Sequence, residues 1–195
     1  MESVSPMKLR LDYIEMPLGG KLFSGRIAVI DVDDAVKVCG VRWFGRNSKR
    51  VRVQDGAHQI TEYAYASNKS GKFLGHPEKV SLHRLVLGIT DPNVHVDHIN
   101  HDGLDCRKRN LRIATHSENT FNSRPQIHSG TSQFKGVSWI TKSKKWRAQI
   151  TKDYRDKHLG EFECEIDAAI AYDDAAMHLF GEFAYLNFPT RKVAS

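Results

Sequence analysis

The sequence lacks any long apolar run, and no stretch approaches the roughly 18–20 consecutive apolar residues that a membrane-spanning helix needs. Its first residues, MESVSPMKLRLDYIEM, lack the charged and then apolar pattern of a secretory signal. Long repeats and low-complexity tracts are also missing. Since the chain has 40% hydrophobic and 27% charged residues, we expect a globular, intracellular protein of one or two domains with no membrane partner.

Cysteine is scarce, and its spacing excludes one class of site. The three cysteines are Cys39, Cys106 and Cys164, so they cannot all form disulfides with one another. No two of them have the CxxC spacing of a structural zinc site. The sequence therefore predicts ordinary reduced thiols.

Acidic residues are scarce in one stretch and abundant in the next. The net charge is +6. Residues 131–160 contain eight Lys and Arg against two Asp, whereas residues 161–195 contain two basic residues against seven acidic ones. Overall basicity is weak evidence for nucleic acid binding, but this distribution predicts a domain with two oppositely charged faces.

Polar residues with hydrolytic chemistry gather in residues 94–124. VHVDHIN alternates like a strand that ends at Asp97 and His98, and NLRIAT (110–115) has the pattern of a second strand. Thr115-His116-Ser117-Glu118 matches a capping box, which predicts a helix that carries Asn119. We expect two strands and a helix around one site.

These residue types suit phosphodiester hydrolysis. A histidine with a pKa near 7 can deprotonate water, which makes His98 the candidate general base. Oxygen ligands hold hard cations, and Asp97 and Asn119 supply them. Asn110 is expected to hydrogen-bond across the loop. An isolated Asp-His pair is usually structural, so the prediction depends on all four residues together.

The same residues resemble the HNH nuclease family, in the subfamily of phage and intron-encoded homing endonucleases. The resemblance rests on the following residues: Leu82-His83-Arg84, Val96-Asp97-His98-Ile99-Asn100, Leu104-Asp105, Asn110-Leu111-Arg112, Thr115, Asn119 and Asn122. It implies a ββα-metal finger with Asp97 and Asn119 as metal ligands, His98 as general base and Asn110 as brace. It also implies Mg²⁺ or Mn²⁺ as cofactor, double-stranded DNA as substrate, and a phage or mobile element in a bacterial cytoplasm as setting.

The roles of three further residues in or near the finger are less well defined by the sequence. His101 stands where relatives usually have Gly or another small residue, and we expect a surface histidine there. His83 and Arg84 either brace the finger or touch DNA, and the sequence does not decide between these roles.

The region before the finger, residues 1–75, gives short and weak strand signals. GRIAVIDV (25–32) is apolar and β-branched, as a buried strand should be. Residues 41–53 contain five Lys and Arg residues and no acidic residue. Trp43 and Phe44 lie among these basic residues. This pattern fits a basic hairpin that touches phosphate, and it fits equally a solvated strand pair with an aromatic contact to the core.

The segment 134–188 predicts three short strands, KGVSWI, KWRAQIT and KHLGEF, followed by a helix from about Glu165 to Phe180. It resembles the plant ethylene-response-factor (APETALA-type) DNA-binding domain through Lys135-Gly136-Val137, Trp146, Leu159-Gly160, Ala171-Tyr172-Asp173 and Leu186-Asn187-Phe188. Ser138, Ile140 and His158 depart from the family pattern, so its target sequence does not transfer. The predicted DNA contacts are Lys135, Arg147, Gln149 and Lys152, with Lys144, Lys145 and Lys157 on phosphates.

The sequence thus predicts an α+β protein: a β-rich region (1–75), a nuclease finger (76–124), a linker (125–133) and a DNA-binding domain (134–190). The predicted function is metal-dependent DNA cleavage by a monomer or weak dimer with no obligate protein partner. One alternative is a non-catalytic, sequence-specific DNA-binding regulator in which the finger is only a scaffold. Another is an RNA-acting or structural protein.

Overall fold

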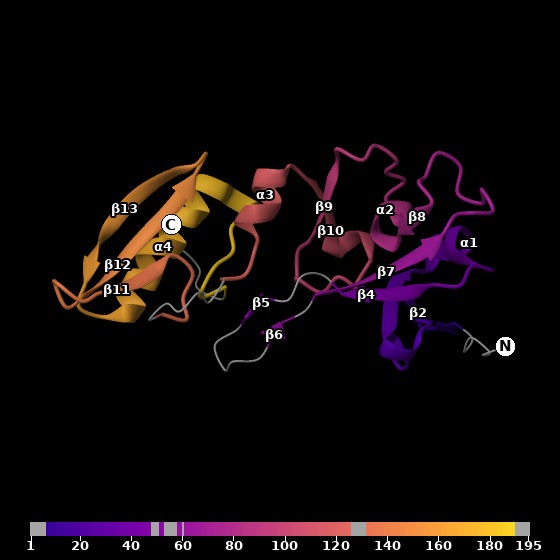
Figure 1. The fold of residues 1–195 in the computed structure, drawn as a ribbon, viewed down its shortest axis with the longest axis horizontal. Helices are drawn as coiled ribbons and strands as arrows, with labels where there is room; N and C mark the ends of the chain where they lie inside the picture. The colour runs from indigo at the N-terminus through magenta and orange to yellow at the C-terminus, as the bar shows by residue number, and fades with distance from the viewer. Residues whose placement is uncertain (1–6, 48–50, 53–57, 60, 126–131, 190–195) are drawn as a thin grey trace. The chain divides into compact units, whose positions relative to one another are not determined.

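The computed structural model describes residues 7–47, 51–52, 58–59, 61–125 and 132–189. The chain divides into two compact units. Unit 1 comprises Met1–Arg50 and Ile60–Ala114, and unit 2 comprises Val51–Gln59 and Thr115–Ser195. Both combine small antiparallel sheets with a few helices (Figure 1). The predicted linker 125–133 lies largely outside the described residues.

The described residues of unit 1 form three small antiparallel sheets, ordered β1-β2-β3, β4-β7-β8 and β10-β9. Their strands are β1 (Lys8–Leu9), β2 (Tyr13–Pro17), β3 (Ile27–Asp31), β4 (Phe44–Asn47), β7 (Glu62–Ser67), β8 (Lys79–Ser81), β9 (His95–His98) and β10 (Leu111–Ala114). The helices are η1 (Lys21–Phe23), η2 (Val32–Asp34), α1 (Ala35–Val38), α2 (Leu82–Val86) and η3 (Lys108–Asn110).

One hydrophobic core serves all three sheets of unit 1. It contains Met16 and Ile30 from the first sheet, Ala64 from the second, and Leu111 from the β9–β10 pair. Alternation sets this arrangement, because Ile14 and Met16 on β2 are buried while their neighbours are only half-buried. The predicted strand 25–32 is β3. Trp43 is buried in this core, whereas residues 48–50 and 53 of the basic stretch lie outside the described residues.

The loop between β9 and β10 pairs with the N-terminal sheet. The backbone N–H of Val29 donates to Leu104 O at 2.8 Å, and the N–H of Cys106 donates to Val29 O at 2.8 Å. These bonds form a parallel bridge between Val29 and Asp105. Lys108 adds an ion pair with the buried Asp34, at 3.0 Å. Residues 27–34 therefore hold the loop that follows the Asp-His pair.

Unit 2 contains the predicted sheet and helix. Strands β11 (Val137–Ile140), β12 (Lys145–Lys152) and β13 (Arg155–Phe162) form an antiparallel sheet, and α4 (Glu165–Phe180) covers one face of it (Figure 1). Ala148 and Ile150 on β12 and Ala168 and Tyr172 on α4 are buried, and Ile150 and Tyr172 belong to one hydrophobic cluster. The unit also includes β5 (Val51–Arg52), β6 (His58–Gln59), α3 (His116–Phe121) and η4 (Gly181–Phe183).

No helix in the described part of the chain is both long and apolar enough to span a membrane.

Candidate active site

The end of strand β9 places Asp97 and His98 next to each other in the interior of unit 1. Asp97 is 5% exposed and His98 is 6% exposed. β9 pairs with β10 in a register that sets Asp97 opposite Arg112 and His98 opposite Leu111. A buried carboxylate and a buried imidazole need partners, because each loses its hydration on folding.

Arg112 supplies the partner of Asp97. Its Nε and one terminal nitrogen both donate to Oδ2 of Asp97, at 2.9 Å and 2.6 Å. Both side chains are largely buried, and a charge-assisted pair of this kind fixes the orientation of the carboxylate. The carboxylate is a hard oxygen donor, which is the ligand type that Mg²⁺ and Mn²⁺ take.

His98 lies in an aromatic and apolar environment. Its ring centroid is 5.7 Å from that of Tyr63 and 5.1 Å from that of His83. Its Nε2 is 3.9 Å from Sγ of Cys106. Burial lowers the pKa of His98 to about 4, although the nearby Asp97, Asp102 and Asp105 act in the opposite direction. The imidazole is therefore neutral at pH 7, but its pKa is below the value near 7 that the sequence suggested.

Asn110 bonds across the loop that follows His98. Its Nδ2 donates to Oδ1 of Asn100 at 2.9 Å and to the backbone O of Asp105 at 2.8 Å. Its Oδ1 accepts from the backbone N–H of Asn100 at 3.0 Å. These are the cross-loop bonds that the sequence led us to expect of this residue, and they hold the chain on both sides of the loop.

A second set of bonds in the same loop involves Asp105. Arg107 donates to both of its carboxylate oxygens, each at 2.7 Å, and Asn100 donates to Oδ2 at 3.0 Å. The sequence alone predicts no role for Arg107 or Arg112. Arg112 lies opposite Asp97 in the register of β9 and β10, and a connection as long as the one between these strands does not reveal that register in the sequence.

Asn119 lies on α3, which belongs to unit 2. The predicted capping box is confirmed: the Thr115 side chain accepts from the backbone N–H of Glu118 at 3.2 Å, and the Glu118 carboxylate accepts from the N–H of Thr115 at 2.7 Å. Asn119 is half-buried and is the fourth residue of this short helix. Because Asp97 and Asn119 belong to different units, their shared metal site stays a prediction.

The comparisons with known proteins fall on the same residues. A family model described as HNH endonuclease matches residues 82–121. An uncharacterized HNH endonuclease of Acanthamoeba polyphaga mimivirus is 32% identical over 134 residues, which are 66% of this chain and 68% of the relative. The chain belongs to the HNH endonuclease family. No solved structure matches it.

For this HNH endonuclease, family membership supports nuclease activity and DNA as the binding partner. The matched segment runs from α2 to the end of α3, so it contains the Asp97-His98 pair, Asn110 and Asn119. The family match does not extend over the sheet of unit 2, and the resemblance of residues 134–188 to a plant DNA-binding domain stays a prediction.

The predicted DNA contacts of this HNH endonuclease differ in exposure. Lys144, Lys152 and Lys157 are exposed, and Lys145 lies 3.6 Å from Glu163. Arg147 and Gln149 are half-buried on β12, where Nε of Arg147 donates to Oγ of Ser138 at 3.3 Å.

Lys135, another predicted DNA contact, is hydrogen-bonded within unit 2. Its Nζ donates to the backbone oxygens of Phe121 and Ser123, at 2.7 Å and 2.6 Å, and burial lowers its pKa to about 8. The ammonium group therefore caps backbone carbonyl groups at the C-terminal end of α3.

Proposed function

We propose that this chain is a metal-dependent DNA endonuclease in which His98 is the general base that activates water. The observation that carries the proposal is the buried, neutral His98 beside the carboxylate of Asp97, at a strand end held by Asn110. A neutral imidazole has one lone pair that can accept a proton from water. A phosphate group of bound DNA would raise the pKa of His98, because its negative charge stabilises the imidazolium that forms.

Asp97 and Asn119 are the residues that we propose as metal ligands. A carboxylate oxygen and an amide oxygen match the preference of Mg²⁺ and Mn²⁺ for hard donors. A bound cation would polarise the scissile phosphate and stabilise the leaving 3′ oxygen. Arg112 orients the carboxylate of Asp97 through Oδ2, and Asn110 keeps the loop after His98 in one conformation.

We propose that the sheet of unit 2 positions the enzyme on duplex DNA. Basic residues of β12, β13 and the turn before β12 supply the charge: Lys144, Lys145, Arg147, Lys152 and Lys157. Gln149 supplies an amide that can hydrogen-bond to a base edge. Since the protein has one Asp97-His98 pair, a monomer is expected to nick one strand. The motif resemblance supports a homing endonuclease of a phage or other mobile element in a bacterial host.

Cleavage of supercoiled plasmid tests the proposal. Wild-type protein with Mg²⁺ is expected to convert the plasmid to the nicked form, and EDTA or His98→Ala is expected to abolish conversion. The matched control is His95→Gln, which changes a half-buried histidine of the same strand. Binding of duplex DNA without cleavage in Mg²⁺ or Mn²⁺, on plasmid that carries native candidate sequence, would reject the nuclease and favour the DNA-binding regulator.

A further inference from the structure

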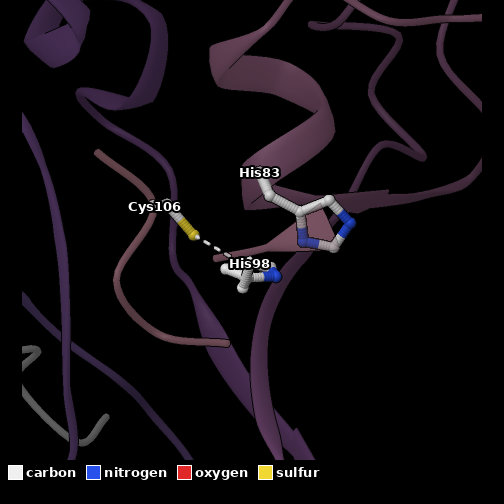
Figure 2. Close-up of side chains that lie close together, drawn as sticks. All are labelled: His83, His98 and Cys106. Atoms are coloured by element: carbon white, nitrogen blue, oxygen red, sulfur yellow. Dashed lines mark hydrogen bonds between the residues drawn. The ribbon is translucent and has the colours of Figure 1, made fainter. Parts of the chain in front are cut away.

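Three side chains with metal-binding atoms converge in the interior of unit 1. His83 comes from the first turn of α2, His98 from the end of β9, and Cys106 from the loop after it (Figure 2). The ligand atoms that they offer all lie within 4.8 Å of one another. Asp97 is not one of the three, so the cluster differs from the hard-cation site proposed above.

The donor set has the chemistry of a site for a soft or borderline metal ion. Two imidazoles and a thiol are the ligands that Zn²⁺ and Co²⁺ take, whereas Mg²⁺ prefers oxygen. Burial lowers the pKa of His83 to about 3, which leaves its imidazole neutral and its lone pair available at pH 7. Within the described residues, no hydrogen-bond partner meets the buried Nδ1 of His83. A buried nitrogen without a partner is costly, and a bound ion would satisfy it.

We propose that His83, His98 and Cys106 form a binding site for a thiophilic divalent cation such as Zn²⁺, and that occupation of this site blocks the action of His98 as a base. In the binding step the Cys106 S–H bond breaks, its proton goes to solvent and a sulfur–metal bond forms. The two histidines each contribute one nitrogen lone pair. The fourth position is available to water, as in other three-ligand zinc sites.

The distances are compatible with such a site after a small contraction. Zn–N bonds of about 2.0–2.1 Å and a Zn–S bond of about 2.3 Å place tetrahedral ligand atoms roughly 3.3–3.6 Å apart. Sγ of Cys106 is already 3.9 Å from Nε2 of His98. The longer separations need a movement of about 1 Å, which a rotation of the His83 side chain would supply.

The block on His98 follows from the electronic structure of imidazole and rests on the proposed function. A neutral imidazole has one lone pair, and its other nitrogen carries a hydrogen. When a metal ion occupies Nε2, the hydrogen is on Nδ1, so neither nitrogen can accept a proton from water. Because a general base contributes about 10²–10⁴-fold to a rate, zinc bound here is expected to reduce cleavage by about 100-fold or more.

Co²⁺ absorption spectroscopy on the full-length, metal-free protein tests the site without any DNA. The exposed Cys39 and Cys164 are first replaced, as Cys39→Ser/Cys164→Ser, so that Cys106 is the remaining thiol. We expect one equivalent of Co²⁺ to give the intense visible bands of tetrahedral coordination and a thiolate-to-cobalt charge-transfer band. Zn²⁺ is expected to bleach both. Adding Cys106→Ser should remove the charge-transfer band, and His83→Gln should weaken the visible bands, whereas His95→Gln should leave the spectrum unchanged.

Weak octahedral absorption with no charge-transfer band in the Cys39→Ser/Cys164→Ser protein would overturn the site, and this result does not depend on whether the Cys106 or His83 variants fold. A wild-type band that disappears with Cys39 and Cys164 would overturn it as well, since the thiolate ligand would then be one of the exposed cysteines.

The cleavage assay separates this inference from the proposed function. Wild type and Cys106→Ser are each assayed in Mg²⁺ with and without one equivalent of Zn²⁺. For each protein the cleavage rate without Zn²⁺ is divided by the rate with Zn²⁺, and the two ratios are compared. The wild-type ratio is expected to be about 100 or more, and the ratio for Cys106→Ser closer to one. A cobalt spectrum without any plasmid cleavage would keep the site and reject the nuclease. Equal inhibition of wild type and Cys106→Ser by zinc would show that the inhibiting ion binds without Cys106. This result would overturn the proposed block.

Discussion

Among single residues, Arg112 carries a large stabilising role because it neutralises the buried carboxylate of Asp97. We expect Arg112→Met to lower the free energy of unfolding by about 3–5 kcal/mol, since it leaves a buried charge without its partner. Arg112→Lys keeps the charge but cannot donate two bonds to Oδ2, so it should fall in between. Urea denaturation measures both, and a Met variant as stable as wild type would contradict the structure.

His83 and His98 predict sensitivity to acid. In the unfolded chain each binds a proton near pH 6.5, whereas in the folded protein His98 does so only near pH 4 and His83 near pH 3. Between these values the unfolded chain binds more protons, so stability is complete above pH 6.5 and is lost as the pH falls toward 4. Each histidine contributes at most about 1.4 kcal/mol per pH unit.

Urea denaturation in EDTA at pH 7, 6 and 5 measures this loss. His83→Gln should make the decline shallower, whereas His178→Gln, which changes an exposed residue of α4, should leave it as in wild type. Equal slopes in all three proteins would show that His83 is protonated in the folded state.

The roles of some residues could be predicted from the sequence, and others could not. Asn110 was expected to bond across the loop, because an amide between a loop and a strand has few other uses. His101 has φ of 62°, a left-handed conformation that no side-chain pattern in the sequence reveals. Cys106 and His83 are far apart in sequence and have no metal-site spacing, so only the fold brings them to His98.

Among the secondary-structure elements, β11 and α4 depend on the absence of a side chain at Gly136. Its φ is 76°, and a Cβ there would overlap the ring of Tyr172 and lie 2.7 Å from Gln149 O. Gly136→Ala is expected to cost about 3 kcal/mol, from backbone strain and from displacing Tyr172.

The matched control is Gly181→Ala, at φ of 53° and with no described atom within 4 Å of the added Cβ. It should cost only about 1–2 kcal/mol, from strain alone. Thermal unfolding of both variants separates overlap from strain, and equal losses would argue against close packing of α4 on the sheet.

The bounds of helices with a clear hydrophobic period or a capping motif could be predicted closely from the sequence. The helix expected from about Glu165 to Phe180 is α4, and the capping box begins α3 at His116. The role of Asp173 was harder to see. This residue is 1% exposed and accepts from the backbone N–H groups of Asn187 and Phe188, at 2.8 Å and 2.9 Å. Helical periodicity alone cannot show that the carboxylate of Asp173 accepts hydrogen bonds from the backbone of residues that follow α4.

For the whole molecule, the uneven charge distribution predicts the salt dependence of DNA binding. Each phosphate contact contributes about −0.9 to the slope of log K against log salt concentration. Lys144→Gln, Lys152→Gln and Lys157→Gln should each make this slope shallower by about 0.9. The control Lys69→Gln removes an exposed charge of unit 1 that pairs with Glu78, and should change the slope less. Binding titrations between about 50 and 300 mM salt measure the slopes. A slope equal to that of wild type would exclude the substituted lysine as a phosphate contact.

The division of the chain into compact units is the least visible property in the sequence. Motifs suggested boundaries near residues 75 and 124, which follow the limits of the resemblances. The two compact units divide the chain after residues 50, 59 and 114, and β3 shares a core with the β9–β10 pair. The bridge between Val29 and Asp105 spans 76 positions of sequence, as their numbers show, and local patterns carry no information about such a pairing.

That bridge has a consequence for how such a nuclease can be shuffled between genes. The segment 82–121 that defines the family would leave behind β3, which pairs with the loop after His98, and Asp34, which pairs with Lys108. A recombination event that moved this segment alone would transfer the Asp97-His98 pair without the strand that pairs with the loop after it. The segment that must move together to keep these contacts is therefore longer than the matched segment, because it includes β3 and Asp34.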